Sequence, residues 1–368
     1  MNNRYKIIIC LIIIIIYYYQ KKQNKKIPRL GSKPDQKKRT YDEFVEVAQM
    51  FNYDIPVSIK WIKIPCMEEF LPTYLKYKES LLLPIKNQGA CAACWSYSVV
   101  QMIADRISVY TGGKIKRALS AQEMISCWDD SIREDTGCKI GGIPELAYEY
   151  VIKNGVALEK DYEYVQENTT SIVKCDKNKM RKERVYIEPG SNRSLCRNPE
   201  KFKLIRSKYN SIISENILNM KKEIFTNGEI VGTIFVYQNL YDYDGLSIYK
   251  KTSGEYIGGH AVIIIGWSDK GINTSEPGFD DSYWICKNFW STEWPHKSPS
   301  SKGYFYIKMG ENVAGIESRA SRAFPVITPE IRSKMVDSIR SSRYESINEY
   351  VNDPERDNYI NSVGKMKK

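Results

Sequence analysis

The sequence predicts an α+β fold in which a helical region precedes a region rich in strands. After Cys94 the apolar residues recur at intervals of three and four, as on the buried face of a helix: Val99, Ile103, Ile107 and Tyr110. Much later, residues 261–265 and 283–290 form apolar stretches typical of buried strands. With 368 residues, the chain is long enough to bury a substantial core or two separate lobes.

The N-terminus carries a targeting pattern. Arg4 and Lys6 precede an apolar run over residues 7–19, and lysines follow the run. This run is shorter than the ~20 residues that a membrane-spanning helix needs, so residues 1–26 are predicted to be a signal peptide. No small-residue cleavage site follows the run. The alternative is a short signal anchor that attaches the protein to a membrane through residues 7–19.

The net charge of +11 and the isoelectric point near 9.0 do not indicate a nucleic-acid-binding protein. Residues 1–40 contain eleven Lys or Arg and one Asp, so the excess positive charge lies in the targeting region. The rest of the chain is nearly neutral. A basic groove for nucleic acid is therefore not expected.

Cys94 has the sequence setting of an activated thiol. At the start of the predicted helix, unpaired backbone N–H groups and the helix dipole favour a thiolate and lower a cysteine pKa from about 8.5. Gln88, six positions earlier, and the Cys94 backbone N–H are two candidate donors to an oxyanion. The alternatives for Cys91 and Cys94 are a metal clip, a redox pair and a buried apolar filler.

A zinc site lacks ligands in this sequence. His260 and His296 are the only histidines, and there is no second Cys-x-x-Cys pair, so a tetrahedral ligand set cannot be completed. We therefore expect neither a metal nor another cofactor. A redox pair, expected early in a βαβ unit, and a buried filler stay as alternatives at this point.

His260 and Asn288 stand at the ends of the two predicted strands. His260 precedes the stretch 261–265, beside a glycine pair that lets other groups approach closely, and is suited to act as general base and acid. Asn288 follows residues 283–287 and is a candidate to orient the imidazole, with Trp290 shielding that hydrogen bond from water. Each residue alone also has an ordinary structural role. Their order and spacing together favour a catalytic set.

In this order, Gln88, Cys94, His260 and Asn288 resemble the catalytic set of papain-like cysteine proteases, and the chain is most similar to the cathepsin B branch. Other stretches resemble the family's mature N-terminus, the lead-in to the nucleophile, its disulfide segments and the helix end that follows: residues 71–74, 84–89, 119–127, 137–144 and 150–155. The resemblance covers residues 71–325. It implies a two-lobe fold with a helical left lobe, an antiparallel β-barrel-like right lobe and an active-site cleft between them.

The chain is accordingly predicted to have four parts. Residues 1–26 are the signal peptide or signal anchor, and residues 27–70 are a short prosegment without the long helical pattern of many papain relatives. Residues 71–325 are the peptidase domain. Residues 326–368 mix charges evenly and are predicted to be a flexible or peripheral tail. Heavy use of Ile, Lys, Asn and Tyr is typical of an AT-rich coding genome, as in protists and large DNA viruses.

The resemblance implies a role for each matching catalytic residue. Cys94 attacks the carbonyl of a polypeptide substrate, and His260 protonates the leaving amine. Asn288 holds the imidazole. Gln88 and the Cys94 backbone N–H stabilise the oxyanion.

Four further residues are implied in substrate binding. Gly142, in the pair with Gly141, matches the glycine whose backbone pairs with the extended substrate, and Trp290 flanks the primed side. Glu317 matches a glutamate at the floor of the pocket for the second residue before the scissile bond. This match predicts a preference for basic or apolar residues before the cleaved residue. The alternative for Glu317 is a solvated surface charge.

The cysteines indicate an oxidising compartment. The resemblance implies two disulfides: Cys91 with Cys138, and Cys127 with Cys175. It leaves Cys94 free. Outside the N-terminal targeting region, three other cysteines have no assigned partner: Cys66, Cys196 and Cys286, the last predicted in a strand core. Three N-x-Ser/Thr sequons agree with a secretory route: Asn168, Asn192 and Asn273. We expect a secretory or endolysosomal protein, or one anchored to a membrane by its N-terminus.

Several positions depart from the family pattern without removing a reacting group: Ala92, Ala93, Lys139, Ile140, Glu229 and Phe289. Two of them, Ala92 and Phe289, support, as an alternative function, a catalytically weak or silent protein that binds peptides. A membrane-tethered structural factor is a second alternative. Cys94 and His260 are also farther apart than the ~130–150 residues typical of the family, and the polar stretch 181–206 is predicted to be a surface insertion that accounts for this.

The expected reaction is internal cleavage of polypeptides by a monomer. In the cathepsin B branch, release of C-terminal dipeptides depends on a loop that carries histidine. Residues 155–224 contain no histidine. An endopeptidase is therefore expected rather than a carboxydipeptidase.

Overall fold

A computed structural model describes residues 81–128, 138, 141–171, 173–268, 281–297 and 302–335. The predicted signal region and prosegment, Cys66, the sequon at Asn273 and residues 336–368 lie outside the described residues.

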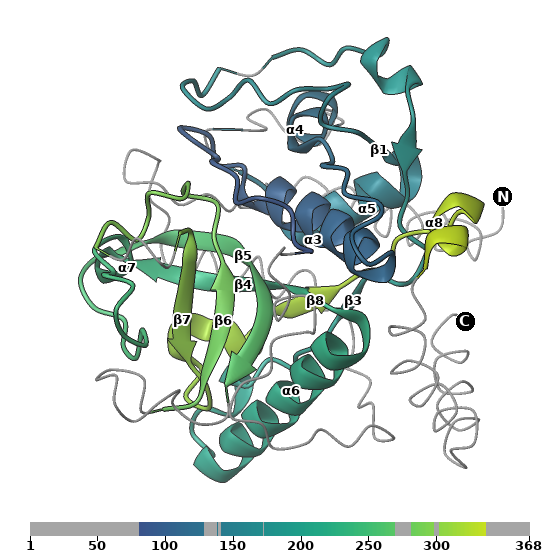
Figure 1. Cartoon of the computed structure of the whole chain (residues 1–368). Coiled ribbons are helices and arrows are strands. Elements are labelled where there is room, and N and C mark those ends of the chain that lie inside the picture. The colour runs from purple at the N-terminus through teal and green to yellow at the C-terminus, as the bar shows by residue number, and fades with distance from the viewer. Residues whose placement is uncertain are drawn as a thin grey trace, which may run out of the picture.

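The helices α3, α4 and α5 build one lobe (Figure 1). The predicted helix after Cys94 is α3 (Cys94–Tyr110), and it is buried along its whole length. Next to it pack α4 (Ala121–Cys127) and α5 (Pro144–Asn154). The Ser120 hydroxyl accepts the Glu123 backbone N–H at 3.0 Å and caps α4, and Pro144 starts α5.

An antiparallel sheet of six strands builds the other lobe in the described part of the chain, in the order β3-β8-β4-β5-β6-β7. Its strands are β3 (Arg193–Ser194), β4 (Ile230–Tyr237), β5 (Tyr256–Ser268), β6 (Tyr283–Lys287), β7 (Tyr304–Lys308) and β8 (Ala320–Arg322). The predicted stretch 261–265 lies in the central strand β5, and residues 283–287 are β6. The predicted α+β class is confirmed.

The remaining elements connect and cover the two lobes. They are β1 (Val156–Ala157), β2 (Arg184–Val185), η3 (Lys179–Arg181), η4 (Glu200–Phe202), α6 (Arg206–Asn227), α7 (Gln238–Tyr241), η5 (Val313–Ser318) and α8 (Pro329–Lys334). The long helix α6 lies on the side of the sheet away from α3, α4 and α5 (Figure 1). Among the described helices, none combines the length and the apolar character that crossing a membrane requires.

Two large apolar clusters correspond to the two lobes. The first surrounds α3 and includes the inward face of α5. The second fills the sheet lobe, where Trp267, Trp284 and Phe305 meet Met220 and Ile224 of α6. Residues of β5 enter both clusters, since Ile263 belongs to the first and Ile264 to the second. The central strand therefore joins the lobes, as alternation of side chains across a strand requires.

The polar stretch 181–206 is not a surface insertion, so that prediction is wrong. Its first part forms β2, which pairs with β1 beside the helical lobe, and its middle forms β3, which pairs with β8 in the sheet. Between and after these strands, Ile187, Leu195 and Cys196 are buried. The stretch is the connection from one lobe to the other, and many of its polar side chains are on its outer side.

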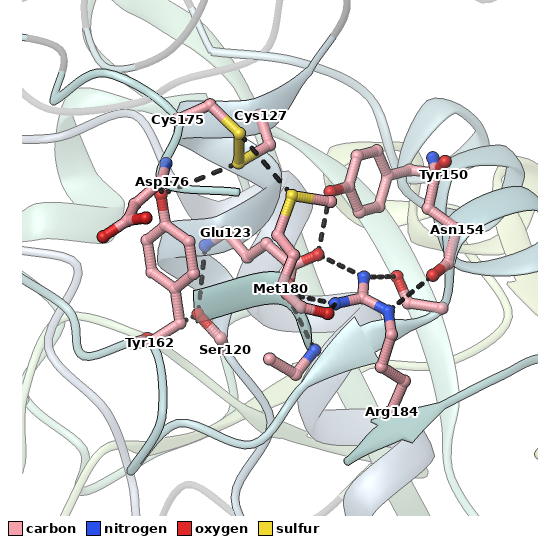
Figure 2. Close-up of polar contacts among 12 residues, drawn as sticks. Ser120, Glu123, Cys127, Tyr150, Asn154, Tyr162, Cys175, Asp176, Met180 and Arg184 are labelled. Atoms are coloured by element: carbon pink, nitrogen blue, oxygen red, sulfur yellow. Dashed lines mark hydrogen bonds and ion pairs between the residues drawn. A yellow bond between two sulfur atoms is a disulfide. The ribbon is translucent and has the colours of Figure 1, made fainter. Parts of the chain in front are cut away.

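Arg184 explains why this connection is polar (Figure 2). Its guanidinium is paired with the carboxylate of Glu123, which is fully buried on α4, and it donates to the carbonyls of Asn154, Gly155 and Met180. The same carboxylate accepts the Tyr150 hydroxyl and the Ala157 backbone N–H, each at 2.8 Å. One buried carboxylate thus ties α4, α5, β1 and β2 together.

The beginning of the predicted tail is packed against the body. Val326 donates its backbone N–H to the Tyr186 carbonyl at 2.9 Å, and Ile331 of α8 is buried in the first apolar cluster. Glu330 pairs with Arg117. The packed region therefore extends at least to residue 335, ten residues past the predicted boundary at 325.

We predict that Arg184→Met lowers the free energy of unfolding by roughly 3–5 kcal/mol, because it leaves the Glu123 carboxylate buried without its cation. Urea unfolding followed by tryptophan fluorescence measures the change. Adding Glu123→Gln to this variant should recover part of the loss, since the uncompensated charge is then removed. The control is Arg193→Met, which removes one exposed bond to the Gly190 carbonyl and should change stability by less than about 0.5 kcal/mol. Equal losses in the two single variants would contradict the prediction.

Candidate active site

Four residues far apart in the sequence converge where the lobes meet. Cys94 is the first residue of α3, His260 lies in β5, Asn288 directly follows β6, and Gln88 lies in the segment that leads into α3. All four are fully buried in this structure. The Cys94 thiol lies against β5, where it interacts with the backbone N–H of Ala261, the neighbour of His260.

The contact between His260 and Asn288 determines how the imidazole is protonated. His260 Nε2 and Asn288 Oδ1 are 2.7 Å apart. The Phe289 backbone N–H donates to the same Oδ1 at 2.8 Å, which assigns this atom as the amide oxygen. Because an amide oxygen only accepts, Nε2 carries the hydrogen and Nδ1 carries the lone pair of the neutral ring.

Aromatic rings hold the imidazole from one side. The Trp290 ring stacks on His260 with centroids 4.8 Å apart, and the Tyr241 ring stacks on Trp290 at the same centroid distance. Trp294 meets Trp290 edge-on at 5.1 Å. The indole therefore covers the hydrogen bond between His260 and Asn288 and limits the rotation of the imidazole.

Buried polar atoms without partners are concentrated at this point. Among the described residues, no hydrogen bond is made by His260 Nδ1, Asn288 Nδ2, Gln88 Oε1 or Trp290 Nε1. Buried polar groups in folded proteins are nearly always hydrogen-bonded, and exceptions call for an explanation such as a catalytic role. A cluster of four such atoms marks this junction as a place for a polar ligand.

Burial keeps both reacting groups neutral in this structure. It raises the pKa of the Cys94 thiol to about 12, although backbone N–H groups of Ala261, Trp95 and Cys94 act in the opposite direction. It lowers the pKa of His260 to about 4, against a smaller opposite effect of the Asn288 hydrogen bond. The expected lowering of the Cys94 pKa at the helix start is therefore not found. The helix terminus is present, but removal of water outweighs it.

Gln88 is held in place by its own backbone and side chain. Its backbone N–H donates to the Phe289 carbonyl at 2.8 Å, and its side-chain Nε2 donates to the Cys91 carbonyl at 2.8 Å. The Tyr164 hydroxyl donates to the Gln88 carbonyl at 2.7 Å. One of the two Nε2 hydrogens is used in this way, which fixes the orientation of the other.

Gly89 shows why the chain needs a glycine next to Gln88. Its φ is +56°, and a Cβ atom built on it would lie 2.0 Å from the Glu167 carbonyl oxygen. A side chain at this position would displace the backbone that carries Gln88.

The two expected disulfides are present, and one of them involves the loop before the nucleophile. Cys91 is bonded to Cys138, and Cys127 is bonded to Cys175. Among the described cysteines, Cys94, Cys196 and Cys286 are free and buried. Cys286 lies in β6 within the second apolar cluster, as expected for a residue of the strand core. The Ala92 backbone N–H donates to the Cys138 carbonyl at 2.8 Å, so the disulfide and this bond together hold the turn before Cys94.

The pair Gly141 and Gly142 lies beside the nucleophile's helix. Gly141 has a positive φ of 74°, and a Cβ on Gly142 would lie 2.6 Å from the ring of Trp95, the residue after Cys94. Only glycine allows the backbone to pass this close to the indole. Ile143, which follows, packs against Phe235 of β4 in a third apolar cluster between the lobes.

Glu317 does not form the floor of a substrate pocket, and that prediction is corrected by its contacts. Its carboxylate is fully buried and accepts three bonds from the protein itself, from Trp284 Nε1 at 3.1 Å and from the backbone N–H groups of Gly310 and Asn312 at 2.6 and 2.7 Å. The alternative of a solvated surface charge is equally wrong. Burial raises the pKa of the Glu317 carboxyl, and the three donors oppose this rise. The residue closes the 310–317 loop.

Arg319, two positions later, is a charged residue at the seam between the lobes. Its guanidinium carbon lies 4.4 Å from the ring centroid of Phe235, the β4 residue that packs against Ile143. Its charge also lowers the pKa of Glu145 on α5, in opposition to the larger raising effect of desolvation. Sequence analysis missed Arg319. No local pattern distinguishes it, because Glu317 lies in η5 and Arg319 directly follows that helix, so the sides that the two residues face depend on where η5 ends.

Phe289 takes the place of a small residue without disturbing the site. Its ring is fully buried in the first apolar cluster and stacks on Tyr97 of α3 with centroids 5.7 Å apart. The neighbouring Trp290 belongs to the second cluster. Asn288 is thus followed by one aromatic residue in each lobe, which fixes the direction of its side chain.

A buried ion pair connects the segments that carry these groups. Lys287, the last residue of β6, places its Nζ 2.8 Å from Asp105 Oδ2 on α3 and 2.7 Å from the Leu83 carbonyl. The other Asp105 oxygen accepts the Leu83 backbone N–H at 2.6 Å. Both charged side chains are fully buried. This contact joins the helix of Cys94, the strand before Asn288 and the segment that continues to Gln88.

Comparisons with known proteins agree with this architecture. A family model described as papain family cysteine protease matches residues 71–324. A gut-specific cysteine proteinase of Caenorhabditis elegans is 29% identical over 238 residues, which cover 64% of this chain and 66% of that protein. A cathepsin B-like cysteine proteinase of Schistosoma japonicum is 29% identical over 248 residues, with the same coverage of both chains. This chain therefore spans just under two thirds of the length of these relatives.

Solved structures show the same fold. The proCathepsin B S9 structure from Trypanosoma congolense matches with a TM-score of 0.57 and 22% identity, and the match covers 82% of this chain and 88% of that one. The two-lobe fold with a helical lobe and a sheet lobe that the sequence resemblance implied is confirmed.

We predict that His260 makes the folded protein less stable in acid. The unfolded chain takes up a proton at the ordinary histidine pKa of about 6.5, whereas buried His260 does so only near 4. Between these values the unfolded state binds more protons, so stability is lost as the pH falls, by a total on the order of 3 kcal/mol. Urea unfolding at a series of pH values measures this, in a Cys94→Ala background to prevent self-digestion. The reference is the same protein with the additional substitution His260→Gln. If stability falls with pH in parallel for the two proteins, the assignment of the acid sensitivity to His260 is refuted.

Proposed function

This chain belongs to the papain family of cysteine proteases, and we propose that it is a cysteine endopeptidase that uses Cys94, His260, Asn288 and Gln88. The observation that carries the proposal is the 2.7 Å contact of His260 Nε2 with Asn288 Oδ1. It leaves the basic Nδ1 of a neutral imidazole without a partner among the described residues, next to the strand position against which the Cys94 thiol lies.

The proposed reaction begins with proton transfer from Cys94 Sγ to His260 Nδ1. The thiolate then forms a bond to the substrate carbonyl carbon, and the carbonyl π electrons move to the oxygen. The second Nε2 hydrogen of Gln88 and the Cys94 backbone N–H stabilise this oxyanion. When the carbonyl re-forms, the amine leaves with the proton from His260 Nδ1, and water releases the acyl group with His260 as base.

The structure corresponds to a resting form in this proposal. With a thiol pKa of about 12 and an imidazole pKa of about 4, the proton stays on Cys94 at neutral pH. Burial is the largest cause of both shifts, so exposure of the junction to solvent moves both values toward each other. We therefore propose that activity requires opening of the junction, consistent with a precursor cleaved near residue 71.

Internal cleavage remains the proposed mode of action. Residues 155–224 contain no histidine to hold a substrate's C-terminal carboxylate, and His296 is exposed in a different segment of the chain. We also propose passage through an oxidising secretory compartment, which the two disulfides support.

We further propose that the substrate carries an acidic side chain near the scissile bond. Arg319 supports this, because its guanidinium lies over Phe235 at the seam, where Phe235 packs against Ile143, the residue after Gly142. A guanidinium binds carboxylates through directed, charge-assisted hydrogen bonds and repels lysine and arginine. The preference thus differs from the basic one that a glutamate at this place would create.

For the catalytic proposal, we predict that an epoxysuccinyl thiol-protease inhibitor labels Cys94 in the protein cleaved near residue 71 and not in the uncleaved chain. Mass spectrometry locates the adduct. His260→Ala should abolish labelling, because the thiolate is no longer formed. Gln88→Ala should keep the label and lower kcat roughly 100- to 1,000-fold, as expected for loss of one oxyanion donor. Cys286, which is equally buried, is the internal control and stays unlabelled. An unlabelled Cys94 in the cleaved protein would favour a silent peptide-binding relative.

For the specificity proposal, we predict that peptide amides with Asp or Glu two residues before the cleaved bond are hydrolysed with a kcat/KM about 10-fold above those with Arg there. Arg319→Glu should reverse the ratio. Glu317→Gln is the matched control, which should leave the ratio unchanged and lower stability, because its carboxylate serves the 310–317 loop. A ratio that responds to Glu317→Gln and not to Arg319→Glu would overturn this assignment.

A further inference from the structure

The segment between η4 and α6 presents two adjacent aliphatic side chains to solvent. Leu204 is 100% exposed and Ile205 is 55% exposed. The backbone around them is ordered, because the Ile205 N–H donates to the Phe202 carbonyl at 2.8 Å and the Tyr209 N–H donates to the Ile205 carbonyl at 2.9 Å. The exposure is thus built into a defined turn. We call residues 201–208 the apolar tip.

Positive charges flank the aliphatic pair on both sides. Four exposed basic residues belong to the apolar tip: Lys201, Lys203, Arg206 and Lys208. Residues 201–214 contain no Asp or Glu, and the nearest preceding acid, Glu200, is 3.7 Å from Lys203 Nζ. The Lys208 ammonium lies 4.1 Å from the ring centroid of Phe202. The cations therefore surround an apolar centre on a chain that is otherwise nearly neutral outside its N-terminal region.

The apolar tip is carried on a rigid support. Directly behind it, the Tyr209 hydroxyl accepts a hydrogen bond from Asn312 Nδ2 at 3.1 Å. One turn later, Ile212 and Ile213 are buried, and Asn216 Nδ2 donates to the carbonyls of Arg197 and Glu317. Its helix, α6, lies on the side of the sheet away from the helical lobe (Figure 1). None of the proposed catalytic residues belongs to it.

We propose that the apolar tip docks the protein onto an anionic phospholipid surface. Leu204 and Ile205 enter the boundary between headgroups and acyl chains, and the four cations contact the phosphate and carboxylate groups of the lipids. A stable protein interface buries about 800 Å² on each partner, more than two side chains on a convex turn offer. A lipid surface has negatively charged headgroups above an apolar layer of acyl chains. The headgroups can therefore pair with the cations of the apolar tip while the aliphatic side chains reach the apolar layer.

The test uses the full chain with Cys94→Ala and vesicles of phosphatidylcholine with or without phosphatidylserine. Hydrogen–deuterium exchange identifies the segment that contacts the vesicle. It therefore distinguishes contact through the apolar tip from membrane attachment through residues 7–19. We expect protection of residues 201–210 only with phosphatidylserine, and its loss at high salt.

The variants separate the apolar and the charged contributions. Leu204→Ser with Ile205→Ser should lower the partition coefficient at least ~10-fold and abolish the local protection. The double variant Lys201→Gln/Lys203→Gln should weaken binding only to the vesicles that contain phosphatidylserine. The matched control is Leu246→Ser, since Leu246 is also 55% exposed but lies beside Asp242 and Asp244, and binding should not change.

Three results would overturn the proposal. The first is an absence of vesicle-induced protection at residues 201–210. The second is equal partitioning of the double variant Leu204→Ser/Ile205→Ser and its parent. The third is protection of these residues by polyglutamate but not by vesicles. The last result would assign the apolar tip to an acidic protein partner. None of these outcomes depends on peptidase activity.

Discussion

The buried pair of Lys287 and Asp105 is the contact on which the geometry of the junction depends. Two full charges without solvent are stable only when each is matched by a partner and by hydrogen bonds, and here the Leu83 N–H and carbonyl complete both sides. Since Lys287 precedes Asn288, Asp105 lies on the helix of Cys94 and Leu83 leads toward Gln88, one ionic contact sets the relative positions of three proposed catalytic segments.

Burial then decides the chemical state of the groups that this contact brings together. The start of α3 offers the electrostatic environment that stabilises a thiolate, yet the thiol pKa is raised because no water reaches it. The same burial lowers the pKa of His260. Desolvation acts against the charged form of an acid and of a base alike. The same residues can therefore be inert when covered and reactive when solvated, without any change in their hydrogen-bond partners.

Among the described residues, some charged side chains hold the fold and others face outward or into the seam. Both oxygens of the Glu123 carboxylate and both oxygens of the Glu317 carboxylate accept hydrogen bonds from neighbouring donors, so these residues act as fixed ties between elements. Arg319 lies over an aromatic ring at the seam, and the cations of the apolar tip extend into solvent. A carboxylate or guanidinium has a functional meaning only after its internal partners are known.

Local pattern was sufficient for the elements with strong periodicity. The three-and-four spacing after Cys94 predicted α3, and the apolar stretches around 261–265 and 283–287 predicted β5 and β6, because these residues are buried by their own element's geometry. The order of Gln88, Cys94, His260 and Asn288 led to the correct family. Only the tertiary structure decided four features of the chain. They are the raised pKa of Cys94, the hydrogen bonds from the protein itself to the Glu317 carboxylate, the position of Arg319 at the seam between the lobes, and the connection between the lobes that residues 181–206 form. Each of these features depends on contact partners that are distant in the sequence and on the exclusion of water. The spacing of neighbouring residues encodes neither the distant contacts nor the exclusion of water.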